Sequence, residues 1–135
     1  MAAPTPYLLP PGTARRALEH YESVFGGELA LFTFGQLGRT DGPSELIAHG
    51  ELKGAVAVSA ADAAPGESSL RVEGLLLALL GAADPAVLRD WFERLGDGGE
   101  VIDPLQRRPW GDFDGQVRDR WGVTWLIGWQ GDSKG

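Results

Sequence analysis

The chain of 135 residues contains no cysteine and only two histidines. The absence of cysteine excludes disulfides, thiolate metal sites and cysteine nucleophiles together. Lysine and arginine number 12 against 19 aspartates and glutamates, which gives a formal net charge of −7. Because a nucleic-acid surface needs clustered basic side chains, we expect no nucleic-acid partner.

The sequence also lacks a long hydrophobic run. Its most apolar stretch, residues 74–83, is too short to cross a bilayer. The first residues show no basic region followed by an apolar stretch, so we see no secretory signal. We therefore expect a cytoplasmic protein with no membrane partner. The composition, 43% hydrophobic and 23% charged, is typical of one globular domain over residues 1–135.

One short pattern is present twice. "YESVFGGEL" begins at residue 21, and "WFERLGDGGEV" begins at residue 91. In each copy, apolar residues at helical spacing precede Gly-Gly-Glu and an aliphatic residue. The residues that correspond are Leu18, Tyr21 and Phe25 in the first copy and Leu88, Trp91 and Leu95 in the second. We interpret this as a duplication, with convergent helix-stop chemistry as the alternative for this segment alone.

Strand, helix and turn signals follow the same order in both halves. The first half is expected to contain a strand at 7–9, a helix at 14–25 and strands at 28–34, 45–52 and 55–59. The second half is expected to contain a strand at 75–80, a helix at 85–95 and strands from 99, at 116–119 and at 124–129. Thr13 and Asp84 are expected to cap the two helices. The prediction is an α+β fold of two βαβββ modules, 1–66 and 67–135, with helices on the backs of the sheets.

Three stretches carry a family resemblance: "PYLLPPGTARRALEHYESVFGGEL", "IAHGEL" and "WGDFDGQVRDRWGVTWLIGW". In order and spacing they resemble PhnB-like members of the vicinal oxygen chelate superfamily. That superfamily includes glyoxalase I, extradiol dioxygenases, fosfomycin-resistance enzymes and bleomycin-resistance proteins. The resemblance implies sheets curled into an open cup, a homodimer and, in the enzymes, a divalent metal that binds vicinal oxygens of the substrate. The methyltransferase label sometimes given to the PhnB-like branch lacks support here, since no glycine-rich nucleotide loop is present.

The metal positions that the resemblance implies are mostly occupied by other residue types. The glutamate of the last strand falls on Leu126, and the first-strand histidine or glutamine falls near Pro6 or Tyr7. The strand that opens the second half offers only Glu73. We therefore expect no metal centre of the family's kind and no cofactor. A metal site built from His49 and carboxylates is the alternative.

His49 and Glu51 are the candidate catalytic residues, because a spacing of two places them on one face of a strand. His49 is either a half-buried histidine bonded to the backbone or an acid, base or hydrogen-bond donor that faces the cup. The candidate ligand-binding residues are Tyr7, Trp110, Thr124 and Leu126.

The tryptophans have different expected roles. Trp91 belongs to the buried stripe of the second helix, so we interpret it as core. If Leu126 faces the cup, Trp125 faces the helix layer. Trp110 lies in a loop, where it is either a wall of the ligand site or an ordinary packing residue.

Two functions stay open at this point. The first is a protein that binds a small molecule in an apolar cup without the metal, as the likeness to bleomycin-resistance proteins implies. The alternative is a metal-dependent enzyme similar to glyoxalases or dioxygenases that uses His49 and carboxylates. A third possibility is a degenerate member kept for structure or interaction.

Overall fold

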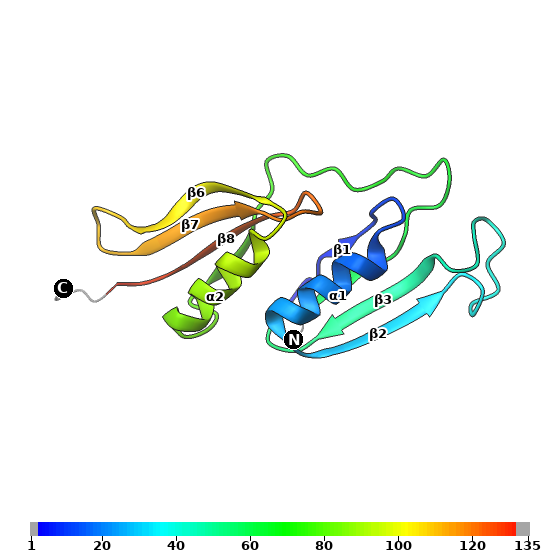
Figure 1. The fold of residues 1–135 in the computed structure, drawn as a ribbon, viewed down its shortest axis with the longest axis horizontal. Coiled ribbons are helices and arrows are strands. Elements are labelled where there is room, and N and C mark those ends of the chain that lie inside the picture. Colours follow the sequence, from blue (N-terminus) through cyan, green and yellow to red (C-terminus); the bar gives the residue numbers. More distant parts are fainter. Residues whose placement is uncertain (1–2, 132–135) are drawn as a thin grey trace. The chain divides into compact units, whose positions relative to one another are not determined.

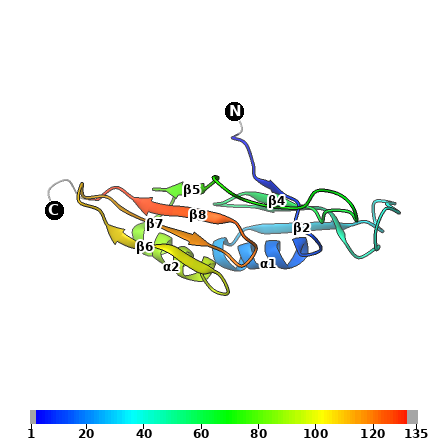
Figure 2. The ribbon, with the colours of Figure 1, turned by 90° about the horizontal axis from the view of Figure 1, so that it is seen from above.

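The computed structural model describes residues 3–131, and the chain divides into two compact units, Met1–Leu70 and Arg71–Gly135. Each unit is one helix packed on one face of a four-stranded mixed sheet (Figures 1 and 2). The division lies in the connection between the two sheets. The boundary after residue 66 that the sequence suggested lies in the same connection.

The first unit has the order strand, helix, strand, strand, strand. Its elements are β1 (Tyr7–Leu8), α1 (Ala14–Phe25), β2 (Glu28–Thr33), β3 (Ile47–Lys53) and β4 (Val58–Ala60). In the sheet the strands lie in the order β1-β4-β3-β2. β1 is parallel to β4, whereas the other neighbours are antiparallel.

The second unit repeats this order. Its elements are β5 (Leu77–Leu80), α2 (Pro85–Leu95), β6 (Glu100–Arg107), β7 (Phe113–Arg118) and β8 (Thr124–Trp129). The strands lie in the order β5-β8-β7-β6, with β5 parallel to β8 and the others antiparallel. The predicted α+β fold of two βαβββ modules is therefore confirmed.

Both helices bury an apolar side against their own sheet. The buried residues follow the helical spacing expected from the sequence: Ala14, Ala17, Leu18, Tyr21, Val24 and Phe25 in α1, and Leu88, Trp91, Phe92 and Leu95 in α2. Trp91 is 5% exposed, so its interpretation as core is confirmed. Full burial of a large apolar side chain contributes about 1.5–3 kcal/mol, so the contact between helix and sheet contributes substantially to the stability of each unit.

The repeated Gly-Gly connects helix to strand in both units. Gly27 has a φ of 105°, and a Cβ there would lie 2.5 Å from the carbonyl oxygen of Lys53. Its counterpart Gly99 has no room for a Cβ either, because the carbonyl oxygen of Arg118 occupies that space. In each unit the helix-to-strand connection thus passes directly over the end of the neighbouring strand, which only glycine permits.

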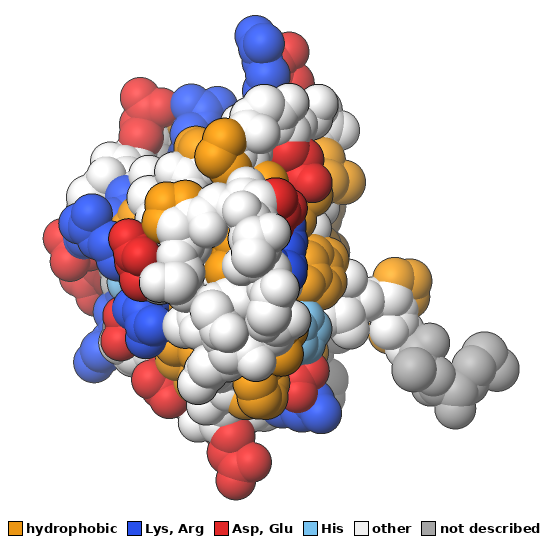
Figure 3. Space-filling model, turned by 90° about the vertical axis from the view of Figure 1, so that its right-hand side faces the viewer, with side chains coloured by type: hydrophobic (Ala, Val, Ile, Leu, Met, Phe, Trp, Pro, Cys, Tyr) orange, Lys and Arg blue, Asp and Glu red, His pale blue; other side chains and the backbone are white. Residues whose placement is uncertain are grey.

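Charges are dispersed over the surface. On the face drawn in Figure 3, acidic and basic side chains are interspersed rather than gathered by sign. Exposed ion pairs such as Arg39–Asp41 at 2.6 Å and Arg94–Asp90 at 3.0 Å belong to this pattern. Neither helix among residues 3–131 is long and apolar enough to cross a membrane.

The N-terminus of α1 is closed by a distant carboxylate rather than by Thr13. The Thr13 side chain makes no hydrogen bond to the helix. Asp62, which is 3% exposed, accepts hydrogen bonds at 2.8 Å from the N–H of Ala14 through Oδ1 and from the N–H of Ile47 through Oδ2. The expectation for Thr13 is wrong because the fold brings Asp62 to the position of the cap. Asp84 likewise makes no side-chain hydrogen bond to α2.

We predict that Asp62→Asn lowers the free energy of unfolding by about 1.5–3 kcal/mol, because the amide NH₂ would face a buried backbone donor. Thr13→Ala should change it by less than about 0.5 kcal/mol, since no cap bond is lost. Urea unfolding followed by circular dichroism measures both. Asp97→Asn, at an exposed side chain, controls for the change in net charge. Equal losses in the Asp62 and Thr13 variants would contradict the assignment of the cap to Asp62.

Candidate functional site

β3 has one face against α1 and one face away from it. Leu52 is 1% exposed, and a Cβ on Gly50 would lie 2.5 Å from Cδ1 of Leu18 in α1. Because successive residues of a strand point to opposite faces, His49 and Glu51 lie on the face away from the helix. We define the open face of the first sheet by Tyr7, Phe32, His49 and Glu51.

Strand pairing brings side chains of three strands together on this face. Glu51 lies opposite Ser59 of β4, and Ser59 lies opposite Tyr7 of β1. His49 lies opposite Phe32 of β2. Residues paired in this way share a face of the sheet. Strands β1, β2 and β3 therefore place one phenol, one imidazole, one carboxylate and one phenyl ring on the same face.

A β-bulge determines where this face begins. Phe32 pairs with His49, but the next residue, Thr33, pairs with Ile47, so Ala48 is an extra residue in β3. A bulge inserts one residue and reverses the alternation beyond it. Ile47 can therefore be buried, at 1% exposed, although it is only two residues from the open-face His49.

The polar groups of the open face form a chain of contacts. The hydroxyl of Tyr7 is hydrogen-bonded to Nδ1 of His49 at 2.9 Å. Nε2 of His49 lies 3.5 Å from Oε2 of Glu51, whose Oε1 lies 3.4 Å from Nζ of Lys53. A carboxylate beside Nε2 favours a proton on that nitrogen, which leaves Nδ1 of the neutral ring to accept the hydroxyl proton of Tyr7. We call this arrangement the Tyr7–His49–Glu51 chain.

Aromatic rings flank the imidazole. The ring centroids of Tyr7 and His49 are 5.7 Å apart with an angle of 28° between the planes, and those of Phe32 and His49 are 6.3 Å apart with an angle of 18°. Tyr7 is 49% exposed and Phe32 is 42% exposed. The open face thus offers nearly parallel rings that are accessible from one side, with a chain of polar contacts at their edge.

Burial raises the pKa of the Tyr7 hydroxyl, and the positive charge of Arg39 partly opposes this rise. The phenol therefore keeps its proton across the physiological pH range. In this state the Tyr7 hydroxyl can donate a hydrogen bond to His49 while its oxygen accepts a hydrogen bond from a bound molecule.

The structure brings together three residues that the sequence proposed for different roles. His49 and Glu51 were proposed as catalytic residues, and Tyr7 was proposed as a ligand contact. The partner of His49 is the Tyr7 hydroxyl rather than the backbone that the simpler interpretation assumed. Their catalytic and binding roles stay predictions.

The remaining predicted residues belong to the second unit. Trp125, 1% exposed, lies opposite Val117, and a Cβ on Gly96 at the end of α2 would lie 3.4 Å from Cγ2 of Val117. Trp125 thus lies on the helix side of its sheet, and Leu126 is on the other face, as expected. Thr124 is buried at 8% exposed.

Trp110 lies in the turn between β6 and β7 and is 69% exposed. This exposure contradicts ordinary packing, because a packed indole would be covered by its neighbours.

The fold implies a divalent metal, but the donors in the described part of the chain do not fit the family's site. No group of three or more histidine, aspartate or glutamate side chains able to hold a metal is present between residues 3 and 131. His49 and Glu51 supply two common donors, and Leu126 supplies a hydrocarbon where the resemblance implies a carboxylate. His20 belongs to α1, on the opposite side of the sheet from His49, and stacks on Tyr21. We derive no step through a metal.

Sequence reasoning missed Phe32 and Arg39. Phe32 is one of several apolar residues in β2, and only the register of the bulged pair places it beside His49. Arg39 lies in the connection between β2 and β3, and its effect on the pKa of Tyr7 depends on tertiary structure. No local pattern in the sequence distinguishes either residue.

Comparisons with known proteins agree with this geometry. The family model of the Glyoxalase/Bleomycin resistance protein/Dioxygenase superfamily matches residues 5–127. Protein PA1353 from Pseudomonas aeruginosa is 29% identical with a TM-score of 0.81, over 98% of this chain and 100% of that chain. A PhnB protein from Bacillus cereus, described as a putative 3-demethylubiquinone-9 3-methyltransferase, is 17% identical with a TM-score of 0.74, over 95% and 99%.

A glyoxalase-related enzyme from Fulvimarina pelagi shares the fold, at 17% identity and a TM-score of 0.60, over 96% of this chain and 89% of that chain. None of the curated proteins matches the chain. At identities this low, similarity to solved structures supports the architecture and leaves the chemistry of the site to its own residues.

We predict that Arg39→Gln raises the pKa of Tyr7 further, because the positive charge that favours the phenolate is removed. Tyrosine ¹³Cζ signals followed by NMR to high pH measure this, with Tyr7→Phe to identify the signal and Arg15→Gln as an exposed control of equal charge. Since the pKa is raised on folding, the associated stabilisation is complete below the ordinary tyrosine pKa and is lost as the pH rises through the folded value. A lower pKa in the Arg39 variant would contradict the stated cause.

Proposed function

Because the chain belongs to the Glyoxalase/Bleomycin resistance protein/Dioxygenase superfamily, we propose that it binds a small, flat organic molecule without the family's metal. The site we propose is the open face of the first sheet. The observation that carries the proposal is the 2.9 Å hydrogen bond between Tyr7 and His49, at the edge of exposed, nearly parallel rings.

The rings supply the apolar part of the binding energy. Tyr7 and Phe32 are each about half exposed, so a flat ligand laid against them removes apolar surface from water. Such burial stabilises a complex by about 25 cal/mol per Å². Aromatic pairs in offset or edge-to-face contact add about 0.5–1.5 kcal/mol.

The Tyr7–His49–Glu51 chain supplies the polar part. Glu51 orients His49, Nδ1 of His49 accepts a hydrogen bond from the Tyr7 hydroxyl, and the Tyr7 oxygen then presents its free lone pairs to the ligand. A group that accepts hydrogen bonds in this way selects a ligand with a hydroxyl, amine or amide donor. Buried or half-buried polar groups discriminate strongly against analogues that leave them unpaired.

The second unit contributes its own proposed contacts. We propose that Leu126 provides apolar surface on this unit where metal-dependent relatives are expected to carry a carboxylate, and that Thr124 and Trp110 contact a molecule bound to the second unit by itself. Of these, Trp110 has the most accessible side chain, at 69% exposed. A homodimer in the cytoplasm stays a prediction of the sequence.

A metal-dependent glyoxalase- or dioxygenase-like enzyme is the second candidate. It is favoured by one observation, the 3.5 Å approach of His49 to Glu51, because an imidazole and a carboxylate are both common metal ligands. Metal analysis of the protein purified without chelators separates the two candidates. A tightly held metal at one equivalent, lost in His49→Gln, would replace the binding proposal by the enzymatic one.

We predict that 4-methylphenol binds the open face about fivefold more tightly than toluene, which is the value of one neutral hydrogen bond of about 1 kcal/mol. In Tyr7→Phe the two probes should bind equally, because the only change is the loss of the Tyr7 hydroxyl. NMR titration that follows the ring signals of His49 measures the four affinities as a double-mutant cycle.

The matched control for this cycle is Thr13→Ala, which loses a hydroxyl in the same unit at the start of α1. It should leave the fivefold preference unchanged. If the preference survives in Tyr7→Phe, or if neither probe moves the His49 signals of the unaltered protein, the proposed site is wrong.

A further inference from the structure

We propose that the second unit contains a binding pocket for a small organic cation with an apolar or aromatic body. The pocket has a volume of about 510 Å³ and lies where β5 and β8 end and β7 begins. Volumes of about 300–1,000 Å³ are typical of small-molecule sites. All its lining residues belong to the second unit, so the proposal does not rest on the open face of the first sheet.

The pocket forms because the neighbouring strands β5 and β8 end at different positions. β5 ends at Leu80, and the N–H of Gly81 donates the last hydrogen bond of this edge to the carbonyl oxygen of Gly128 at 2.8 Å. β8 continues to Trp129 beside the first residue of β7, Phe113. The shorter β5 therefore leaves open the space beside the ends of β7 and β8.

The pocket lies at the strand ends and is lined from both faces of the sheet. Phe113 and Trp129 lie on the face that packs on α2, whereas Leu80 and Asp114 lie on the other face. The rings of Phe113 and Trp129 are stacked, with centroids 5.1 Å apart and an angle of 16° between the planes. The guanidinium of Arg89 lies 5.0 Å from the centroid of Trp129, which holds that ring in place from the side of α2. Leu80 adds an aliphatic side chain that is 58% exposed.

Among the residues that the structure describes, the charged side chains that line the pocket are two carboxylates, Asp112 and Asp114. Oδ1 of Asp112 accepts a hydrogen bond from the N–H of Gly131 at 3.2 Å, which orients the carboxylate. Asp114 accepts a hydrogen bond from Nε of Arg108 at 2.6 Å through Oδ1. Each carboxylate has a second oxygen with further lone pairs for a ligand.

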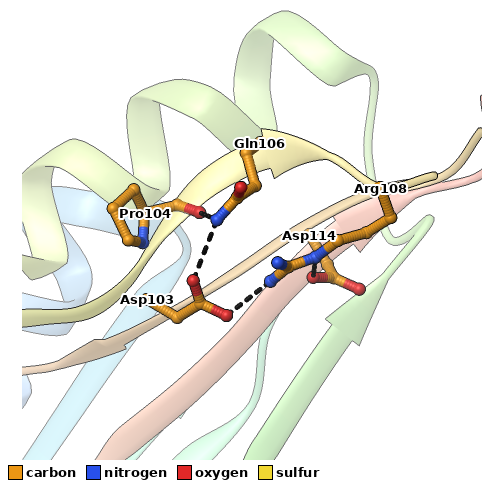
Figure 4. A network of polar contacts seen from close by, with 5 residues as sticks. All are labelled: Asp103, Pro104, Gln106, Arg108 and Asp114. Atoms are coloured by element: carbon orange, nitrogen blue, oxygen red, sulfur yellow. Dashed lines mark hydrogen bonds and ion pairs between the residues drawn. The ribbon is translucent and has the colours of Figure 1, made fainter.

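Arg108 fixes Asp114 before any ligand binds. Figure 4 shows the guanidinium of Arg108 between Asp103 and Asp114, and Gln106 donates to Asp103 at 2.9 Å. The Arg108 side chain is only 20% exposed. A carboxylate that is already oriented loses little conformational freedom on binding, which favours affinity.

These features select a cation. A protonated amine forms charge-assisted hydrogen bonds with carboxylates, which are about twice as strong as neutral ones. An anion would be repelled by both carboxylates of the lining. A purely apolar molecule would remove the carboxylates from water without offering them hydrogen bonds. The net charge of −7 also attracts cations to the protein at low ionic strength.

The test compares three probes of similar size: 2-phenylethylammonium, 2-phenylethanol and 3-phenylpropionate. NMR titration follows the indole signal of Trp129 and the amide signal of Gly81. The cation should bind about tenfold more tightly than the alcohol, as expected for a charge-assisted over a neutral hydrogen bond, and the anion should bind least. Equal affinities for cation and alcohol, or no movement of these two signals with any probe, would overturn the proposal.

Two pairs of variants locate the effect. Asp112→Asn should weaken cation binding about tenfold, whereas Asp97→Asn, at a side chain that is 81% exposed, changes the net charge equally and should have no effect. Leu80→Arg should abolish binding by filling and charging the pocket, whereas Leu75→Arg, at a residue that is 60% exposed, should not. Equal effects within either pair, or cation-induced shifts at Gly50 of the first sheet in place of Gly81, would show that the pocket is not the site.

Discussion

Helix α1 packs on β3 at Gly50, where the terminal methyl groups of Leu18 and Leu31 occupy the space that a side chain would need. A Cβ there would lie 2.5 Å from Cδ1 of Leu18 and 2.9 Å from Cδ2 of Leu31. This contact determines which residues of β3 are covered and which are open. His49 and Glu51, on either side of Gly50, must both point away from the helix. The position of the proposed site thus follows from packing on the other face of the sheet, where a side chain at residue 50 would have to displace the ends of Leu18 and Leu31.

The two units share one architecture but carry different side chains at their exposed positions. Both have a helix on a sheet of the same strand order, and both pass from helix to strand through a glycine that lies against the neighbouring strand, Gly27 or Gly99. The first sheet carries an exposed imidazole beside a carboxylate and a phenol. The second carries Leu126 on its open side and the Arg108 network at its end. The two units share the helix–sheet arrangement, and they differ at the exposed positions.

The sequence predicted the architecture well because architecture depends on periodicity. Apolar spacing in the helices, glycine at their ends and strand-like runs between turns are local signals, and the structure places elements close to the expected ranges. The sequence also predicted that His49 and Glu51 lie on one face, since a spacing of two in a strand implies a shared face. The sequence could not reveal what depends on contacts between distant segments. Asp62 closes the N-terminus of α1, and the bulge at Ala48 allows Ile47 to be buried beside an open His49.

The proposed site depends on Glu51 orienting His49 so that Nδ1 of the ring accepts a hydrogen bond from the Tyr7 hydroxyl. The most direct test is a long-range ¹H–¹⁵N correlation spectrum of the histidine rings at neutral pH, with His49→Gln to separate the signals of His49 from those of His20. For the neutral form of the His49 ring we expect the proton on Nε2, and an Nδ1 signal that moves when Tyr7 is replaced by phenylalanine. A proton on Nδ1, or an Nδ1 signal that does not respond to the loss of the Tyr7 hydroxyl, would contradict this arrangement.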